Sequence, residues 1–286
     1  MNGKKVLIIG SGGLLGGYLI KIFANSIGYS SQELDITKPF DVQKIVEIAK
    51  PDIIIHTAAF TDVEACEVEV DKAFKVNTIG TQNIVNCCID EDILFVFISS
   101  TGVYGSYKAE AYTEFDNADP QTVHHRSKYE AEKIVRNHIN KYLILRTGWI
   151  FGGDVFHKKN FVYQRYLDAK NSDLIYSNDS QVGNPTYALD LAEQIKVLID
   201  AKQYGTYNCV NHAEHVSRYD YVKGIIDLFS LDCEVKVATE GMFKRVAPVS
   251  NNESALNYKL ELLDLNCMGN WDDALQHYIL SLKENI

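Results

Sequence analysis

In the first half of the chain, short apolar runs alternate with longer stretches of helical periodicity. The runs hold aliphatic, β-branched and aromatic residues without polar alternation, and they cover residues 6–9, 53–55, 94–98 and 143–145. Such runs are typical of strands that helices cover on both faces, as in a parallel sheet. Strands and helices that alternate in this way connect by right-handed crossovers. The pattern therefore predicts an α/β fold with a Rossmann-type, doubly wound parallel sheet.

A glycine-rich turn follows the first predicted strand. It reads Gly10-Ser11-Gly12-Gly13-Leu14-Leu15-Gly16, and residues 14–24 then have the apolar spacing of a helix. Glycines in such a turn permit positive φ, let the backbone approach a pyrophosphate and allow the helix to pack closely on the strand. The helix N-terminus offers free N–H groups and partial positive charge to phosphates. Because a strand precedes the turn and a helix follows it, we expect a bound dinucleotide.

The pattern becomes less regular after Gly152. Helical segments are predicted at residues 158–170, 187–201, 217–230 and 271–284, with brief strand-like runs at 174–176 and 206–210. We therefore expect a dinucleotide-binding Rossmann domain over residues 1–152. Residues 153–286 are expected to form a smaller substrate-binding lobe, with discontinuous contributions to the main sheet left open. In open α/β folds ligands bind at the carboxyl edge of the sheet, so a second ligand is expected between the lobes.

The spacing Gly10-x-x-Gly13-x-x-Gly16 resembles that of the extended short-chain dehydrogenase/reductases. Further similar segments are Asp35-Ile36 at the end of the second strand region, His56-Thr57-Ala58-Ala59 at the end of the third strand, and Val76-Asn77-x-x-Gly80-x-x-Asn83 in a helix. The resemblance implies NADP or NAD as cofactor, with Asp35 against the adenine amino group. It implies as cofactor-binding residues Gly10, Gly12, Gly13, Leu14, Leu15, Gly16, Asp35, Ile36, Ala58, Ala59, Asn77 and Lys128. From the residues alone, helix capping before Pro39 is an equal alternative for Asp35.

The choice between NADP and NAD is open at this level. A 2′-phosphate favours a cation just after the second strand, and Ser30-Ser31-Gln32 contains none. Lys4, Lys5 or Lys38 could still reach this place in the folded chain.

Further motifs extend the resemblance over nearly the whole chain and point to the dTDP-4-dehydrorhamnose reductase branch. They are the segments 33–37, 51–59 and 145–152, Asn160-Phe161, Asn178-Asp179-x-Gln181-x-Gly183-x-Pro185-Thr186, Gly205-x-Tyr207-Asn208, Leu256-x-x-x-Lys259-Leu260 and Trp271. Members of this branch pass a hydride from the nicotinamide to the 4-keto group of a nucleotide-linked deoxysugar. The resemblance therefore implies an oxidoreductase of the type found in dTDP-rhamnose biosynthesis, with a nucleotide-linked sugar as substrate.

In this family a Tyr-x-x-x-Lys pair and a Ser or Thr serve the reacting carbonyl. Ser100, at the end of the fourth strand, matches the Ser/Thr position, and Lys128 matches the Lys. The Tyr position holds His124, one helical turn before Lys128. Ketone reduction needs donors that polarise the carbonyl and an acid that protonates the alkoxide. The expected catalytic residues are therefore Ser100, His124 and Lys128.

The missing tyrosine leaves three interpretations open. In the first, His124 or its neighbour His125 acts as the acid, directly or through water. In the second, the site has lost turnover, and the protein binds a sugar nucleotide or has a regulatory role. In the third, Tyr104 or Tyr129 has taken over proton transfer. Water elimination fits less well, because family dehydratases carry an Asp-Glu pair where this chain has Thr101-Gly102.

The predicted substrate lobe departs from the branch as well. The branch carries an Arg-rich turn before its Ser-x-Leu segment, whereas residues 247–256 contain no arginine. Because arginine binds phosphate through two parallel hydrogen bonds, Arg245 or Lys244 is the candidate replacement. Trp149 is expected at the interface between the lobes.

Two other groups of side chains have simple explanations. Tyr104, Tyr107 and Tyr112 follow the fourth strand, where they could stack a base or pack together. His212 and His215 have no third ligand nearby in the sequence, so we expect a solvated loop and no metal site.

The composition limits the remaining choices. Apolar residues make up 46% and charged residues 23% of the 286 residues, as in ordinary globular proteins, and the net charge is −10. An acidic surface repels nucleic acid. No apolar run is long enough for a signal peptide or a membrane span, and the six cysteines lack metal-binding spacing. We expect a cytoplasmic protein without nucleic acid or membrane partners, with a possible homodimer through the helices at 65–90.

Overall fold

The computed structural model describes residues 3–239 and 241–286. Its centre is a six-stranded sheet in the order β2-β1-β3-β4-β5-β9, and all neighbouring strands are parallel. The strands are β1 (Val6–Ile9), β2 (Ser26–Tyr29), β3 (Ile53–His56), β4 (Leu94–Ser100), β5 (Tyr142–Thr147) and β9 (Gly205–Asn208). The predicted α/β fold with a parallel Rossmann-type sheet is confirmed.

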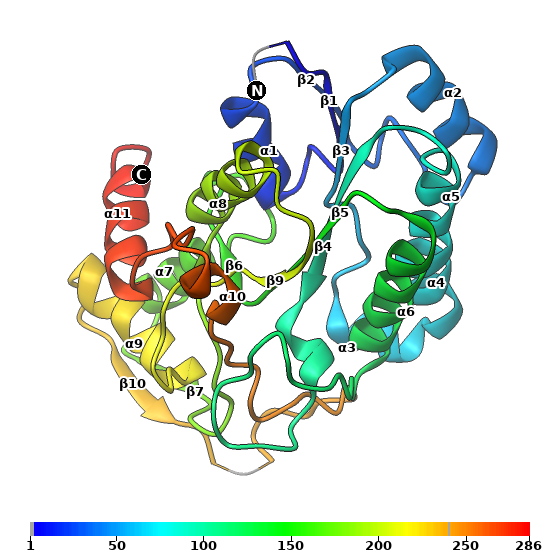
Figure 1. Cartoon of the computed structure of the whole chain (residues 1–286). Helices are drawn as coiled ribbons and strands as arrows, with labels where there is room; N and C mark the ends of the chain where they lie inside the picture. The colour runs from blue at the N-terminus through cyan, green and yellow to red at the C-terminus, as the bar shows by residue number, and fades with distance from the viewer. Residues whose placement is uncertain (1–2, 240) are drawn as a thin grey trace.

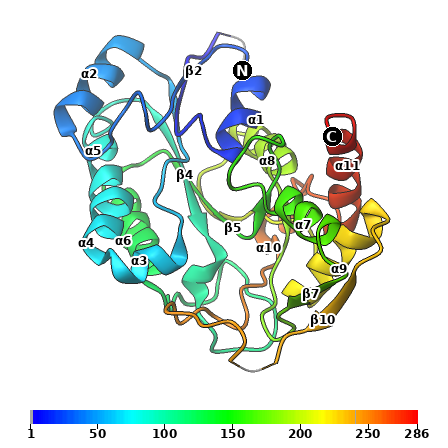
Figure 2. The ribbon, with the colours of Figure 1, turned by 180° about the vertical axis from the view of Figure 1, so that it is seen from behind.

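Helices cover both faces of this sheet (Figures 1 and 2). One face packs against α1 (Leu14–Ile22) and α8 (Ala188–Asp200), and the other packs against α2 (Pro39–Ala49), α5 (Gly80–Asn86) and α6 (Val123–His138). Successive residues of a strand point to opposite faces, so Ile8 belongs to the first core and Leu7 to the second. This double burial explains why the strands are apolar without alternation.

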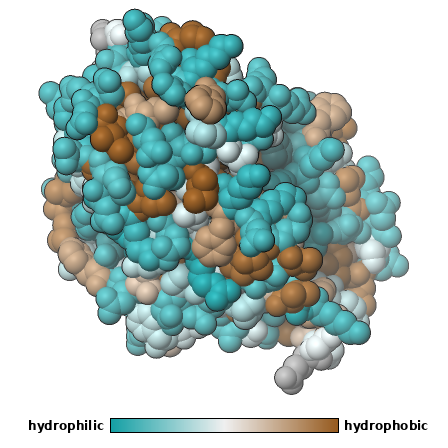
Figure 3. All heavy atoms as spheres, turned by 90° about the vertical axis from the view of Figure 1, so that its right-hand side faces the viewer, coloured by the Kyte–Doolittle hydropathy of each residue, from teal (hydrophilic) through white to brown (hydrophobic). Residues whose placement is uncertain are grey.

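Between β3 and α5 the chain forms three short helical segments. These are α3 (Val63–Val68), α4 (Val70–Phe74) and the π-helical turn η1 (Lys75–Ile79), which continues directly into α5. Together with α6 they form the side of the molecule that Figure 3 shows. That side is mostly hydrophilic, with separate hydrophobic patches.

The second half of the chain builds a smaller assembly beside the sheet (Figure 1). Its helices are α7 (Phe161–Lys170), α9 (Arg218–Phe229), α10 (Tyr258–Leu262) and α11 (Trp271–Lys283). Two small parallel pairs accompany them, β6 (Ile150–Phe151) with β8 (Thr186–Tyr187), and β7 (Leu174–Ser177) with β10 (Glu234–Val237). An aromatic core formed by Phe151, Tyr187, Tyr221 and Tyr278 joins the β6–β8 pair to α9 and α11. The predicted run at 206–210 forms β9 of the main sheet, so this half contributes to both parts.

The predicted end of the second strand is wrong. β2 ends at Tyr29, and Asp35-Ile36 lies in the loop that follows. The reason is a turn at Ser30, whose carbonyl accepts hydrogen bonds from the N–H groups of Glu33 and Leu34. Within the described residues, no helix is long and apolar enough to cross a membrane.

Candidate active site

The glycine turn lies at the carboxyl ends of β1 and β3, where the strand order reverses. Gly10 has a φ of +101°, and a Cβ atom there would lie 2.5 Å from Ala58 N. A Cβ atom at Gly16 would lie 2.3 Å from the carbonyl oxygen of Gly10. Only glycine fits either position, because β3 and α1 approach the turn too closely for a side chain.

The middle of the glycine turn is accessible to a ligand. Gly12 and Gly13 are exposed, and no side chain caps the N-terminus of α1. The first turn of α1 also holds no acidic residue. Backbone N–H groups at such a terminus lack intrahelical partners and favour an anion. Leu14 and Leu15 begin this helix, so the predicted phosphate-binding segment fits a dinucleotide pyrophosphate.

Asp35 and Ile36 lie on the loop between β2 and α2. Asp35 is exposed, and its Oδ1 accepts hydrogen bonds from the backbone N–H of Thr37 at 3.0 Å and the Thr37 hydroxyl at 2.8 Å. These bonds lower the pKa of Asp35. The residue therefore stabilises a local turn, while the N-cap of α2 is Lys38. Ile36 is buried against Gly80, where a Cβ atom would lie 2.7 Å from its Cδ1.

Asn77 holds the backbone of Phe60 in place behind the loop that follows β3. Its Oδ1 accepts from Phe60 N at 2.7 Å, and its Nδ2 donates to Phe60 O at 3.1 Å and to Ser127 Oγ at 2.9 Å. Asn77 is fully buried, with both ends of its amide engaged. Its observed contacts therefore order this loop, on which Ala58 and Ala59 lie partly exposed.

Ser100 lies at the end of β4, and Lys128 lies on α6, which packs against that strand. Ser100 ends β4, as predicted, and its Oγ accepts the N–H of Gly102 at 3.2 Å, which leaves its O–H free to donate. Lys128 is only 4% exposed, and its Nζ lies 4.0 Å from the centre of the Phe97 ring of β4. Within the described residues, no side chain or carbonyl accepts a hydrogen bond from its ammonium. Burial lowers the pKa of Lys128 to about 7.

His124 lies one turn before Lys128, and it is buried as well. Its Nδ1 lies 3.0 Å from the carbonyl oxygen of Phe60, the group that Asn77 also binds. A carbonyl oxygen only accepts, so Nδ1 carries the proton and Nε2 presents a lone pair. Burial, followed by the nearby His125 and Lys128, lowers the pKa of His124 to about 3. The ring is therefore neutral at neutral pH.

His125 occupies a different pocket. Its ring covers Gly102, where a Cβ atom would lie 2.0 Å from the ring carbon Cε1. Its Nε2 lies 4.0 Å from Glu253 Oε1, and its Nδ1 is buried without a hydrogen-bond partner in the described part of the chain. Burial lowers the pKa of His125 to about 4 and raises that of Glu253. The glycine at 102 thus makes room for this second histidine.

Comparison with known proteins identifies the family of the chain. Residues 4–284 match the family model described as the RmlD substrate binding domain. The chain belongs to this family. A dTDP-4-dehydrorhamnose reductase of Aggregatibacter actinomycetemcomitans is 34% identical over 234 residues, 78% of each protein. A crystal structure of a dTDP-4-dehydrorhamnose reductase from Clostridium acetobutylicum is 34% identical, with a TM-score of 0.93 over 98% of this chain and 99% of that one. The reductase of Bacillus anthracis, solved with NADP, is 30% identical, with a TM-score of 0.92 over 97% and 99% of the two chains.

In this member of the RmlD family, Trp149 connects the second lobe to α6. Its backbone has a φ of +43°, a conformation that is strained for a residue with a side chain. Its indole Nε1 donates to Glu253 Oε2 at 2.9 Å, and the guanidinium carbon of Arg218 lies 3.5 Å from its ring centre. The other carboxylate oxygen of Glu253, Oε1, lies near Nε2 of His125. Trp149 therefore packs on residues of the second half of the chain.

Arg218 is the cation that the sequence analysis did not single out. It begins α9, is partly buried, and has no hydrogen bond from its guanidinium to any described residue. Burial lowers its pKa to about 10, and the positive charge of Arg245 acts in the same direction. Arg245 and Lys244 are exposed. Arg218 and Arg245 thus lie near enough to influence each other, and among the described residues the Arg218 guanidinium has ring contacts but no hydrogen bond.

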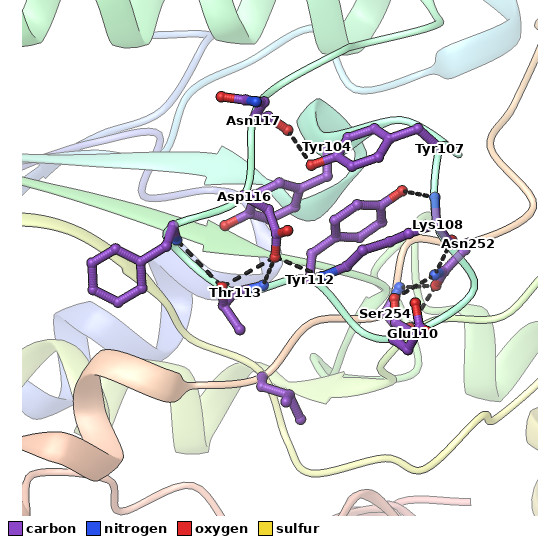
Figure 4. A network of polar contacts seen from close by, with 12 residues as sticks. Tyr104, Tyr107, Lys108, Glu110, Tyr112, Thr113, Asp116, Asn117, Asn252 and Ser254 are labelled. Carbon is purple, nitrogen blue, oxygen red and sulfur yellow. Dashed lines mark hydrogen bonds and ion pairs between the residues drawn. The ribbon is translucent and has the colours of Figure 1, made fainter.

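The tyrosines after β4 pack against one another. Tyr104 and Tyr112 are fully buried, with parallel rings whose centres lie 4.9 Å apart (Figure 4). The Tyr104 hydroxyl donates to Asn208 at 2.7 Å, and burial raises its pKa to about 12. Asn252 closes the loop by donating to the carbonyl oxygens of Lys108, Ala109 and Glu110. These contacts favour packing over base stacking, and they argue against Tyr104 as the acid.

Proposed function

We propose that the protein is an NAD(P)-dependent reductase of a nucleotide-linked 4-keto deoxysugar, similar to dTDP-4-dehydrorhamnose reductase. The single observation that carries this proposal is the arrangement of α6 against the carboxyl end of β4. It brings a buried, unpartnered lysine and a histidine one turn away to the strand that ends at Ser100. Membership of a family with reductases over nearly the whole chain length supports the same conclusion.

The residues at this end of the sheet suit a carbonyl substrate. A bound nicotinamide cofactor would supply the hydride. Ser100 has a free O–H to donate to the carbonyl oxygen, which gains negative charge as the ketone is reduced. Lys128, with a pKa near neutrality and no hydrogen-bond acceptor among the described residues, is available to hydrogen-bond the cofactor and to supply a proton.

The position of the proton on His124 determines how the alkoxide is protonated. Because Nε2 presents a lone pair, His124 accepts a proton from a neighbour before it delivers one. Lys128 is the nearest group on the same helix face with a suitable pKa. We infer that Lys128 holds the proton and that His124 or water passes it on.

A second candidate function follows from the same observation. If the imidazole of His124 stays neutral throughout, the site binds a dinucleotide and a sugar nucleotide without turnover. The pKa of about 3 favours this alternative, because only about one ring in 10⁴ would be protonated at pH 7.

One experiment separates the two. The purified protein is mixed with NADH or NADPH and a nucleotide-linked 4-keto-6-deoxysugar, and loss of absorbance at the nicotinamide band is followed. Turnover supports the reductase and excludes the binding protein. Thermal stabilisation by both ligands without turnover supports the binding protein and excludes the reductase.

We also propose that the protein works in the cytoplasm as a homodimer. Its six cysteines are all free thiols, which suits a reducing compartment. Val68, Val70 and Ile79 are exposed on α3, α4 and η1. Apolar side chains on adjacent helices suit a helix-to-helix contact with a second copy. Light scattering after size exclusion tests this, and a monomer at all concentrations would refute it.

A further inference from the structure

The end of β2 lies directly beside the glycine turn. The carbonyl oxygen of Tyr29, the last residue of β2, accepts hydrogen bonds from Gly10 N at 2.8 Å and Ser11 N at 3.1 Å. A Cβ atom at Gly12 would lie 3.2 Å from Ser30 Cβ. In a dinucleotide bound across such a turn, the adenosine ribose lies over the end of this strand. Ser30 and its neighbours therefore border the ribose.

A carboxylate is fixed at this place. Glu33 Oε2 accepts hydrogen bonds from the backbone N–H of Ser30 at 2.9 Å and from its hydroxyl at 2.8 Å. Both bonds reach the same oxygen, so Oε1 is left for another donor. The two bonds from Ser30 lower the pKa of Glu33, and the side chain is charged at neutral pH.

The lysines that could have countered this charge lie elsewhere. The backbone N–H of Lys5 donates to Asp52 just before β1, at the opposite end of the strand from Gly10, and Lys4 precedes Lys5. Four residues of strand span about 13 Å. Lys38 is the N-cap of α2 and acts on Asp35. Among the described residues, no lysine or arginine forms an ion pair with Glu33.

We propose that Glu33 makes this protein selective for NAD(H) over NADP(H). Its free carboxylate oxygen accepts a hydrogen bond from the ribose diol of NAD and repels the 2′-phosphate of NADP. Ser30 is a positioning residue that holds the carboxylate at the ribose. The inference rests on the dinucleotide binding in the proposed function, and it is independent of whether the site turns over.

Equilibrium titration of the whole protein with NAD⁺ and with NADP⁺, followed by calorimetry, tests the proposal. We expect NADP⁺ to bind about tenfold more weakly than NAD⁺ at low salt. The difference should shrink at high ionic strength, because it arises from exposed charges. In Glu33→Gln the two dissociation constants should approach each other. Glu47→Gln, which removes the same charge from an exposed site on α2, should leave their ratio unchanged.

The outcomes that overturn the proposal are distinct. Equal or tighter binding of NADP⁺ by the unmodified protein refutes the selectivity, as does a ratio that Glu33→Gln leaves unchanged. If neither dinucleotide binds, the dinucleotide-binding part of the proposed function fails and this inference fails with it. A supporting result needs both the selectivity and its loss in Glu33→Gln.

Discussion

The imidazole Nδ1 of His124 lies 3.0 Å from the carbonyl oxygen of Phe60. The same carbonyl accepts a hydrogen bond from Asn77, whose Oδ1 also binds the N–H of Phe60. Asn77 therefore binds both the backbone N–H and the carbonyl oxygen of Phe60, and the same carbonyl also binds the histidine. This arrangement fixes the ring and its tautomer, and it makes His124 an acceptor at Nε2.

The first prediction concerns the missing phenol. If proton delivery limits the reductase, His124→Tyr should raise kcat on a 4-keto nucleotide sugar by about 10–100-fold, since a positioned acid contributes on this scale. His124→Phe, which has neither a donor nor an acceptor, should lower kcat to the level of background. Steady-state rates with saturating cofactor give the comparison.

The control for these variants is cofactor affinity, which both should preserve within a few-fold. An unchanged kcat in His124→Phe would show that His124 has no part in proton transfer. In that case Lys128 alone would have to supply the proton.

The sequence was sufficient to predict the sheet and the glycine turn. Fully buried strands are apolar without alternation, and Gly10 and Gly16 are required by contacts with the neighbouring β3 and α1, so both signals are local and strong. The end of β2 was not predictable in this way. It depends on a turn stabilised by the side chain of Glu33, a residue that in sequence looks like any exposed acid.

The contacts around α6 could not be predicted from the sequence either. Phe60 binds His124 through its backbone carbonyl, and residue identity gives no signal for such a role. Glu253 and His125 are far apart in the chain and meet only in the folded protein. Arg218 looked like an ordinary first residue of a helix. Long-range contacts of this kind follow from tertiary packing, which periodicity does not encode.

The second prediction is a dependence of stability on pH. The folded pKa values of His124 and His125 are about 3 and about 4, against about 6.5 in the unfolded chain. The unfolded state therefore binds more protons between pH 6.5 and pH 4, and stability falls as the pH drops through this window. Titration of these two groups should lower the free energy of unfolding by about 2–4 kcal/mol between pH 7 and pH 5.

Urea unfolding of the unmodified protein and of His125→Asn at pH 5, 6 and 7 measures this effect. The variant should lose less free energy of unfolding on acidification, by about 1–2 kcal/mol, since one titrating ring is gone. If the two proteins lose the same free energy between pH 7 and pH 5, His125 is not buried in its neutral form.

The third prediction concerns Lys128. Its folded pKa of about 7 lies below the unfolded value near 10.4, so burying the ammonium costs stability at and below pH 7. Lys128→Met keeps the volume and removes the charge. It should stabilise the protein by about 1–3 kcal/mol at pH 7 and weaken dinucleotide binding at the same time. The gain in stability should shrink as the pH rises from 7 toward 10.

Thermal unfolding and cofactor titration of the same samples check both parts. Leu94→Met, a change of similar size in the buried part of β4, serves as a control that alters the core without altering the charge. A loss of stability in Lys128→Met at pH 7 would contradict the account of Lys128 as an unpartnered buried cation.

The fourth prediction tests the contact between Gly102 and His125. A methyl group at position 102 would lie 2.0 Å from the His125 ring, so Gly102→Ala should destabilise the protein by about 2–4 kcal/mol. His125→Ala removes the ring. In the His125→Ala protein, Gly102→Ala should lower the free energy of unfolding by about 1–3 kcal/mol less than it does in the unmodified protein. Urea unfolding of the two single variants and the double variant gives this coupling energy. Additive effects would mean that the ring does not fill the space above Gly102, and His125 would then be free to approach the substrate as an alternative acid.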